Sequence, residues 1–93
     1  MAAPPPETPR ARLVVPEFGL DVPLALSLWL VPQGAAVIEG DRVVQLVAGG
    51  ATIDLEAPVT GRLAACLVDE DAAVVTGTVL AEFTADADPR GRS

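Results

Sequence analysis

Few residue types in this chain could do chemistry, and the two most often used as bases and amine nucleophiles are absent. The 93 residues include no histidine, and all six basic residues are arginines, so the chain has no lysine. General base catalysis most often uses histidine, and imine formation needs the lysine amine. We therefore expect no catalysis by this chain alone.

One candidate nucleophile and one candidate cation site remain. Cys66 lies in an apolar segment and has no histidine to activate its thiol, so a structural cysteine is predicted. Asp69, Glu70 and Asp71 form an acidic cluster on a turn. A loose cation site is conceivable there, but a solvated turn is the simpler interpretation, and we expect no metal site.

The composition predicts a soluble protein that binds neither nucleic acid nor a membrane. A net charge of −7 disfavours phosphate groups and anionic lipid surfaces, which attract clustered Lys and Arg. The first residues, MAAPPPETPR, lack the basic and apolar stretches of a signal peptide. No apolar run approaches the roughly 20 residues that span a bilayer. A cytoplasmic location is the default expectation.

Glycines and prolines recur too often in the middle of the chain for helices of ordinary length, which favours short strands joined by tight turns. Residues 1–11 are rich in proline and alanine, and residues 85–93 are polar, so both are predicted to be disordered tails of one β domain at 12–84. The predicted strands are Arg12–Val15, Ala25–Val31, Val43–Ala48, Thr52–Ala57, Arg62–Val68 and Thr78–Thr84, with two very short ones near Val37 and Val74.

The centre of the chain carries the clearest strand and turn signals. Ile53, Leu55 and Ala57 alternate with polar residues, which predicts a strand with one buried face. Gly49-Gly50 stands between two strand-like segments. That composition suits a type I′ hairpin turn, in which both central residues need positive φ.

The two halves of the chain repeat the same plan. A shift of 37 residues sets Trp29 on Cys66, Gly34 on Asp71, Val37 on Val74, Gly40 on Gly77, Val44 on Ala81 and Leu46 on Phe83. A shift of 42 sets Pro16 and Gly19 on Pro58 and Gly61. The first half therefore carries about five extra residues in its loop around 18–23. Two similar halves that meet at a central hairpin predict a β-sandwich with pseudo-twofold symmetry.

These elements also match a known family in their order and spacing. The matching residues are Val15-Pro16, Leu26, Trp29-Leu30-Val31, Gly34, Val37, Gly40-Asp41, Val43, Ala51–Pro58, Gly61, Val74, Gly77 and Leu80. Over about residues 12–84 the chain resembles the lipoyl/biotinyl attachment domains. The resemblance implies an all-β fold: a flattened barrel or sandwich of two four-stranded antiparallel sheets with pseudo-twofold symmetry.

In that family, one lysine at the tip of the central hairpin carries lipoyl or biotin on a long swinging arm. The resemblance places this lysine position at Gly50 and the usual acidic residue before it at Gly49. The Glu-Thr of lipoyl members is replaced by Val47-Ala48. Attachment forms an amide and needs a primary amine, which no side chain here supplies, so no lipoyl or biotin cofactor is expected.

The remaining candidate for function is the surface. The segment 24–31 is apolar at almost every position, whereas a strand of a two-sheet domain should have one wet face. An apolar outer surface often marks a contact site. Partner contacts are predicted at Leu24, Leu28, Trp29, Val47, Ala48, Gly49 and Gly50.

The leading hypothesis is a non-catalytic, unmodified, free-standing lipoyl-like subunit that docks onto an enzyme. The resemblance implies, as partner, a 2-oxoacid-dehydrogenase-type acyltransferase on a separate chain. Such enzymes also act in natural-product pathways such as tetronate formation, where an acyl carrier protein holds the intermediate. One alternative is a carrier or coupling domain of a carboxylase or dehydrogenase complex that acts through another residue. Another is a self-associating structural protein whose apolar edge pairs with itself.

Overall fold

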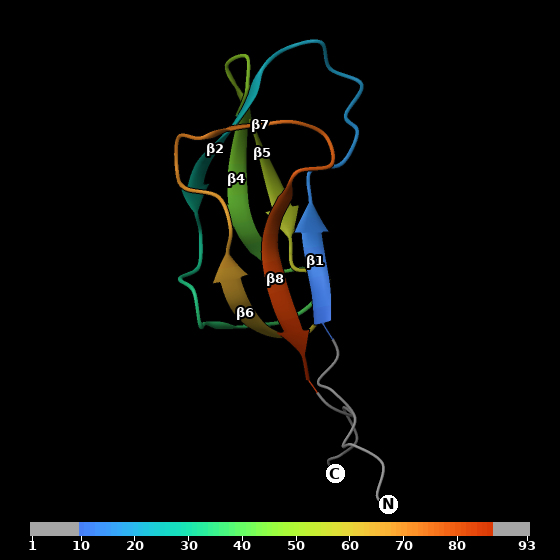
Figure 1. Ribbon diagram of the computed structural model, residues 1–93, viewed down its shortest axis with the longest axis vertical. Helices are drawn as coiled ribbons and strands as arrows, with labels where there is room; N and C mark the ends of the chain where they lie inside the picture. Colours follow the sequence, from blue (N-terminus) through green and yellow to red (C-terminus); the bar gives the residue numbers. More distant parts are fainter. Residues whose placement is uncertain (1–9, 87–93) are drawn as a thin grey trace, which may run out of the picture.

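The computed structural model describes residues 10–86, and this part of the chain folds into two four-stranded antiparallel sheets packed face to face (Figure 1). The all-β prediction is confirmed. The strands are β1 (Arg10–Val14), β2 (Leu24–Trp29), β3 (Ala36–Val37), β4 (Arg42–Ala48), β5 (Ala51–Glu56), β6 (Gly61–Cys66), β7 (Ala73–Val74) and β8 (Val79–Ala85). The sheets remain separate, so the fold is an open sandwich and not a closed barrel.

The strand bounds differ from the prediction by one or two residues at most ends. Arg10, Ala11 and Ala85 belong to strands rather than to the predicted tails, because Arg10 and Ala11 pair with Thr84 and Phe83 of β8, and Ala85 pairs with Gly61 of β6. The rest of the predicted tails consists of residues 1–9 and 86–93. Asp86 is described, and residues 1–9 and 87–93 lie outside the described residues. Both very short predicted strands are present, as β3 and β7.

The predicted pseudo-twofold symmetry is confirmed by the strand order. One sheet is ordered β1-β8-β6-β3 and the other β5-β4-β2-β7, so exchanging the first four strands with the last four converts one order into the other. The turns repeat as well. The Gly34 amide donates to the Leu63 carbonyl at 2.7 Å, and the Asp71 amide donates to the Leu26 carbonyl at 2.6 Å. Each of these pairs is related to the other by the 37-residue shift.

One predicted equivalence is wrong. Gly61 opens strand β6, and its counterpart at the start of β2 is Leu24, whereas Gly19 lies in a loop with φ of +72°. The first half reaches β2 through a longer loop, which shifts Gly19 out of register. Gly61 has a packing role instead, because a Cβ atom there would collide with the Thr84 carbonyl and lie 2.9 Å from Ala85 Cα.

The central hairpin forms as predicted. Ala48 pairs with Ala51, and the two residues between them, Gly49 and Gly50, have φ of +59° and +111°. Positive φ at both positions is the type I′ geometry. The hairpin tip therefore consists of backbone that side-chain-bearing residues adopt only with strain.

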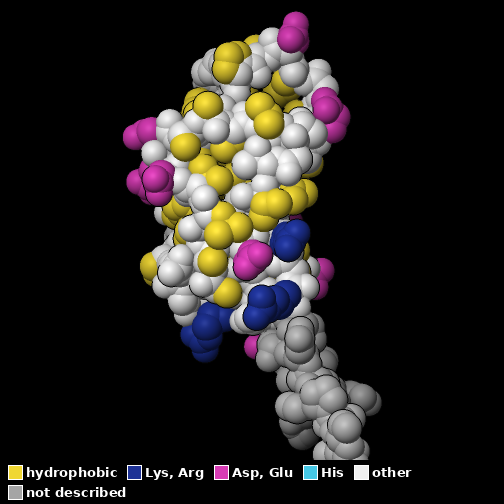
Figure 2. All heavy atoms as spheres, in the orientation of Figure 1, with side chains coloured by type: hydrophobic (Ala, Val, Ile, Leu, Met, Phe, Trp, Pro, Cys, Tyr) yellow, Lys and Arg dark blue, Asp and Glu magenta, His cyan; other side chains and the backbone are white. Residues whose placement is uncertain are grey.

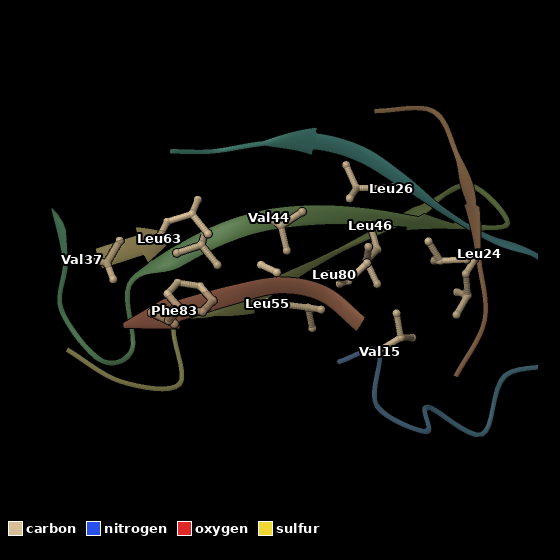
Figure 3. Packing of buried hydrophobic residues seen from close by; sticks show 14 of the residues in the cluster. Val15, Leu24, Leu26, Val37, Val44, Leu46, Leu55, Leu63, Leu80 and Phe83 are labelled. Atoms are coloured by element: carbon tan, nitrogen blue, oxygen red, sulfur yellow. The ribbon is translucent and has the colours of Figure 1, made fainter. Parts of the chain in front are cut away.

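The core lies between the sheets and is built from Val, Leu and Ala with one fully buried aromatic ring, that of Phe83, near Val37 and Leu63 (Figure 3). Phe83 is the largest fully buried side chain, and Leu46 occupies the equivalent position in the other half. Leu55 and Ala57 are buried and Ile53 is partly buried, while Thr52, Asp54 and Glu56 are exposed, so the predicted alternation of this strand is confirmed.

Candidate functional site

The tip of the β4–β5 hairpin lies at the end of the sandwich opposite the first residues of β1 (Figure 1). Gly49 and Gly50 are exposed and present only backbone to solvent. The loop from Pro16 to Pro23 passes beside them. A Cβ atom at Gly49 would lie 3.4 Å from Val22 Cγ1, so Val22 leans against the tip.

Exposed apolar side chains lie in the loop before β2 and in the turn after β7, at this end of the sandwich (Figure 1). Leu20 is 52% exposed, Val22 is 42% exposed, and Val75, in the turn after β7, is 69% exposed. Figure 2 shows hydrophobic side chains over the upper half of the molecule, whereas arginines lie in its lower half. We call Leu20, Val22, Gly49, Gly50 and Val75, together with Val47 below them, the hairpin-end surface.

The described arginines lie away from the hairpin tip. The four described arginines, Arg10, Arg12, Arg42 and Arg62, lie on strand segments away from the hairpin tip, where Arg10 and Arg62 pair with Thr84 and Arg42 pairs with Glu56. Asp21, in the loop beside the tip, is exposed. The hairpin-end surface is therefore apolar, with the acidic side chain of Asp21 in the loop beside it.

The prediction of partner contacts is wrong for two residues, because their side chains belong to the core. Leu24 is 9% exposed and Ala48 is 5% exposed, and the two residues pair with each other across β2 and β4. The prediction treated 24–31 as a strand with two apolar faces. In the structure β2 has a bulge at Ser27, which resets the alternation, so Leu24 points inward and Leu28 outward.

The other predicted contacts lie at different depths. Leu28 is 38% exposed on the outer face of its sheet, and Val47 is partly buried on the same face, in the row next to that of Leu28. Trp29 is packed against the core, and its Nε1–H donates to the Val68 carbonyl at 3.0 Å. The orientation of the Trp29 ring is therefore fixed by its core contacts and by this hydrogen bond. Of the predicted residues, Leu28 and the two glycines are exposed, and Val47 and Trp29 are partly exposed.

The acidic turn serves the fold. Glu70 Oε2 accepts a hydrogen bond from the Trp29 amide at 3.0 Å, and Asp71 adopts φ of +73° at the position equivalent to Gly34. Among residues 10–86, no group of three acidic or cysteine side chains is arranged to hold a metal ion. In the same part of the chain no pocket is present that could hold a small ligand.

Cys66 occupies the place equivalent to Trp29 at the end of β6. Its amide donates to Gln33 Oε1 at 2.9 Å, a bond that matches the one from the Trp29 amide to Glu70 Oε2. Burial raises the pKa of the Cys66 thiol above its ordinary value of 9.0 because the thiolate is poorly solvated there. The thiol therefore stays protonated at neutral pH, which opposes nucleophilic reactivity.

Three residues of the hairpin-end surface were missed by the sequence analysis: Leu20, Val22 and Val75. A signal for the first two was present, since they lie in the extra residues of the first half, where the repeat requires no apolar side chain. Val75 carried no such signal, because the repeat sets it on Ile38, which is also apolar, so Val75 does not stand out in the sequence. In the structure Ile38 is 65% exposed. The described part of the chain contains no helix long and apolar enough to cross a membrane.

Comparison with known proteins agrees with this architecture. A family model described as biotin-requiring enzyme matches residues 11–83. A single-chain, multi-domain long-chain acyl-CoA carboxylase shares the fold with a TM-score of 0.70 and 23% identity, over 97% of this chain and 8% of the carboxylase chain. The lipoyl domain of the 2-oxoglutarate dehydrogenase complex from Azotobacter vinelandii has a TM-score of 0.67 and 18% identity, over 82% of this chain and 98% of that domain.

This chain thus spans only a small part of the carboxylase but nearly the whole of the lipoyl domain. A search of curated protein sequences gives no match. The family model covers most of the chain, including both halves of the repeat and the hairpin between them. The chain therefore belongs to the biotin/lipoyl domain family.

Proposed function

We propose that this protein is an unmodified docking domain of the biotin/lipoyl family, which binds a partner enzyme through its hairpin-end surface. The observation that carries the proposal is the composition of that end. Its tip is Gly49-Gly50 in a chain without lysine, and Leu20, Val22 and Val75 expose apolar area at the same end of the sandwich. A tethered prosthetic group has no amine to attach to at this place, whereas a protein surface has apolar area to cover.

The size and chemistry of the surface suit a protein partner. Burying apolar area contributes roughly 25 cal/mol per Å², so covering Leu20, Val22 and Val75 supplies a useful part of a binding free energy. The absence of a pocket in residues 10–86 argues against a small ligand. The exposed carboxylate of Asp21 beside the tip favours a partner with a basic side chain next to its apolar contact area.

The partner we propose is an acyltransferase of the 2-oxoacid dehydrogenase type, supplied in trans. The likeness to a lipoyl domain of a 2-oxoglutarate dehydrogenase complex supports this choice. In that role the domain completes or stabilises the enzyme without carrying an acyl group. A pathway in which the acyl group arrives on an acyl carrier protein, as in polyketide or tetronate biosynthesis, needs no lipoyl arm and fits an unmodified domain.

Calorimetric titration of the purified full chain into a candidate acyltransferase tests the proposal. The enzymes to be titrated are acyltransferases of the 2-oxoacid dehydrogenase type from the same organism. We expect a saturable complex with a Kd on the order of 1 μM and a negative heat-capacity change, since apolar area is buried. Absence of heat, together with separate elution of the two proteins on gel filtration, would contradict a docking role toward this enzyme.

The carboxylase likeness supports a second candidate, a coupling domain in a carboxylase complex that acts through a residue other than lysine. This candidate requires a covalent group on the chain, because a carrier must hold its cargo. The two candidates therefore differ in one measurable quantity, the mass of the protein purified from its native source.

A further inference from the structure

The two edge strands β1 and β5 lie along the same side of the sandwich, with β1 at the edge of one sheet and β5 at the edge of the other (Figure 1). No other strand of the described part pairs with their outer edges. An open edge presents unpaired N–H and C=O groups that can pair with another strand. Both strands contain five or six residues and no proline, whereas β3 and β7, the edges of the opposite side, have two residues each.

The two edges run in opposite directions. Strand β1 begins at Arg10 and runs toward the hairpin end, and β5 begins beside the hairpin tip and runs away from it (Figure 1). We propose that a second copy of this chain binds along this side, related by a twofold axis parallel to the strands. Each β1 then pairs antiparallel with β5 of the other copy, and each sheet of one copy continues into a sheet of the other.

The backbone of the two strands is suited to this pairing. Strands β1 and β5 occupy equivalent places in the two halves of the fold, so their outward-facing residues present equivalent hydrogen-bonding groups at the open edge. In an antiparallel ladder, residues directly opposite each other must be of the same hydrogen-bonding type. Residues on the outer face of β1 can therefore lie directly opposite residues on the outer face of β5 of the other copy. In this register the hydrogen-bonding types match, and the outer faces of the joined sheets are continuous.

The charges of the two edges are complementary. The exposed side chains of β1 include Arg10 and Arg12, and those of β5 include Asp54 and Glu56. Like charges on edge strands keep copies apart, but here each basic edge meets the acidic edge of the other copy. This complementarity selects a second copy as the occupant, because the twofold axis satisfies both edges at once.

The ion pairs that these charged side chains form within one copy compete only weakly with the ion pairs proposed between two copies. Arg12 Nε lies 3.7 Å from Glu82 Oε2, and Arg42 Nη1 lies 3.8 Å from Asp54 Oδ2. Both arginine side chains are largely exposed, and exposed pairs of this kind contribute little. Among the described residues, Arg10 and Glu56 form no ion pair.

The open side also leaves apolar surface for a second copy to cover. Ala11, Leu13 and Ile53 point toward the core from the two edge strands, yet they are only partly buried. Strands of a second copy extend both sheets past these side chains and shield them. A twofold axis parallel to the strands also places both hairpin-end surfaces at the same end of the dimer, free to bind a partner.

Sedimentation equilibrium of the full chain, up to about 1 mM, tests the proposal without any variant. We expect a monomer–dimer equilibrium with no larger species. A chain that stays monomeric over this range overturns the proposal, and so do open-ended polymers, since they would require an arrangement other than a closed twofold dimer. Binding to the acyltransferase is measured separately, so failure of one idea leaves the other intact.

Two charge-reversal variants identify the interface. The double variants Arg10→Glu/Arg12→Glu and Asp54→Arg/Glu56→Arg each place like charges on both ladders, so each should dimerise at least about tenfold more weakly. Mixed in equal amounts they should form a heterodimer with wild-type affinity, because the reversed edges complement each other. Recovery in the mixture also shows that both variants are folded. Variants that dimerise as tightly as the wild type, or a mixture without recovery, overturn the assigned interface.

Discussion

Replacing Gly61 with alanine is expected to cost about 3 kcal/mol, a large part of the stability of so small a domain. The added Cβ atom would collide with the Thr84 carbonyl, which belongs to the neighbouring strand β8. It would also lie 2.9 Å from Ala85 Cα, so no side-chain rotation relieves the contact and β6 and β8 must separate. Urea unfolding followed by Trp29 fluorescence measures the loss of unfolding free energy.

Gly34→Ala is the matched control. Gly34 has φ of +95°, but no atom lies within 4 Å of the position that its Cβ atom would take. We therefore expect only the cost of the left-handed conformation, about 1 kcal/mol. Equal losses for both variants would show that β6 and β8 do not approach each other as closely as the structure has them.

Placing charge on the hairpin-end surface is expected to weaken binding of the acyltransferase about 100-fold. The double variant Val22→Asp/Val75→Asp puts two carboxylates into the apolar area that the partner is proposed to cover, where they would be desolvated. Both positions are exposed, so the free domain should keep its fold and its unfolding free energy. The calorimetric titration used for the wild type measures the Kd.

The pseudo-twofold symmetry offers a closely matched control for this variant. Ile38 is equivalent to Val75 and equally exposed, at 65% against 69%, but it lies in the turn at the opposite end of the sandwich. Ile38→Asp should therefore leave the Kd unchanged. A loss of binding with Ile38→Asp, or full binding with Val22→Asp/Val75→Asp, would move the contact away from the hairpin end.

Much of the fold could be predicted from the sequence because its signals are local or periodic. The Gly49-Gly50 turn requires positive φ, and the alternation around Ile53 and Leu55 requires a two-sided strand. The 37-residue repeat then predicts the relation between the sheets. The bulge at Ser27 could not be predicted, since its cause is the fit between β2 and β4 in three dimensions. Every prediction about which leucine faces solvent depended on it.

The candidate site was less predictable for the same reason. The lysine-free tip is a matter of residue identity and could be seen in the sequence. Exposure is not: Leu24 and Ala48 differ little in sequence context from Leu28 and Val47, yet the first pair lies in the core and the second reaches the outer face. Leu20 and Val22 gain their meaning from the position of their loop beside Gly49, which only the fold determines.

The intact mass of the protein purified from its native source tests the central claim most directly. With glycines at the hairpin tip and no lysine in the chain, we expect the polypeptide mass with no lipoyl, biotinyl or acyl addition. A covalent prosthetic group on any residue of the native protein would contradict the claim, because the domain would then be a carrier and its hairpin end would serve another purpose.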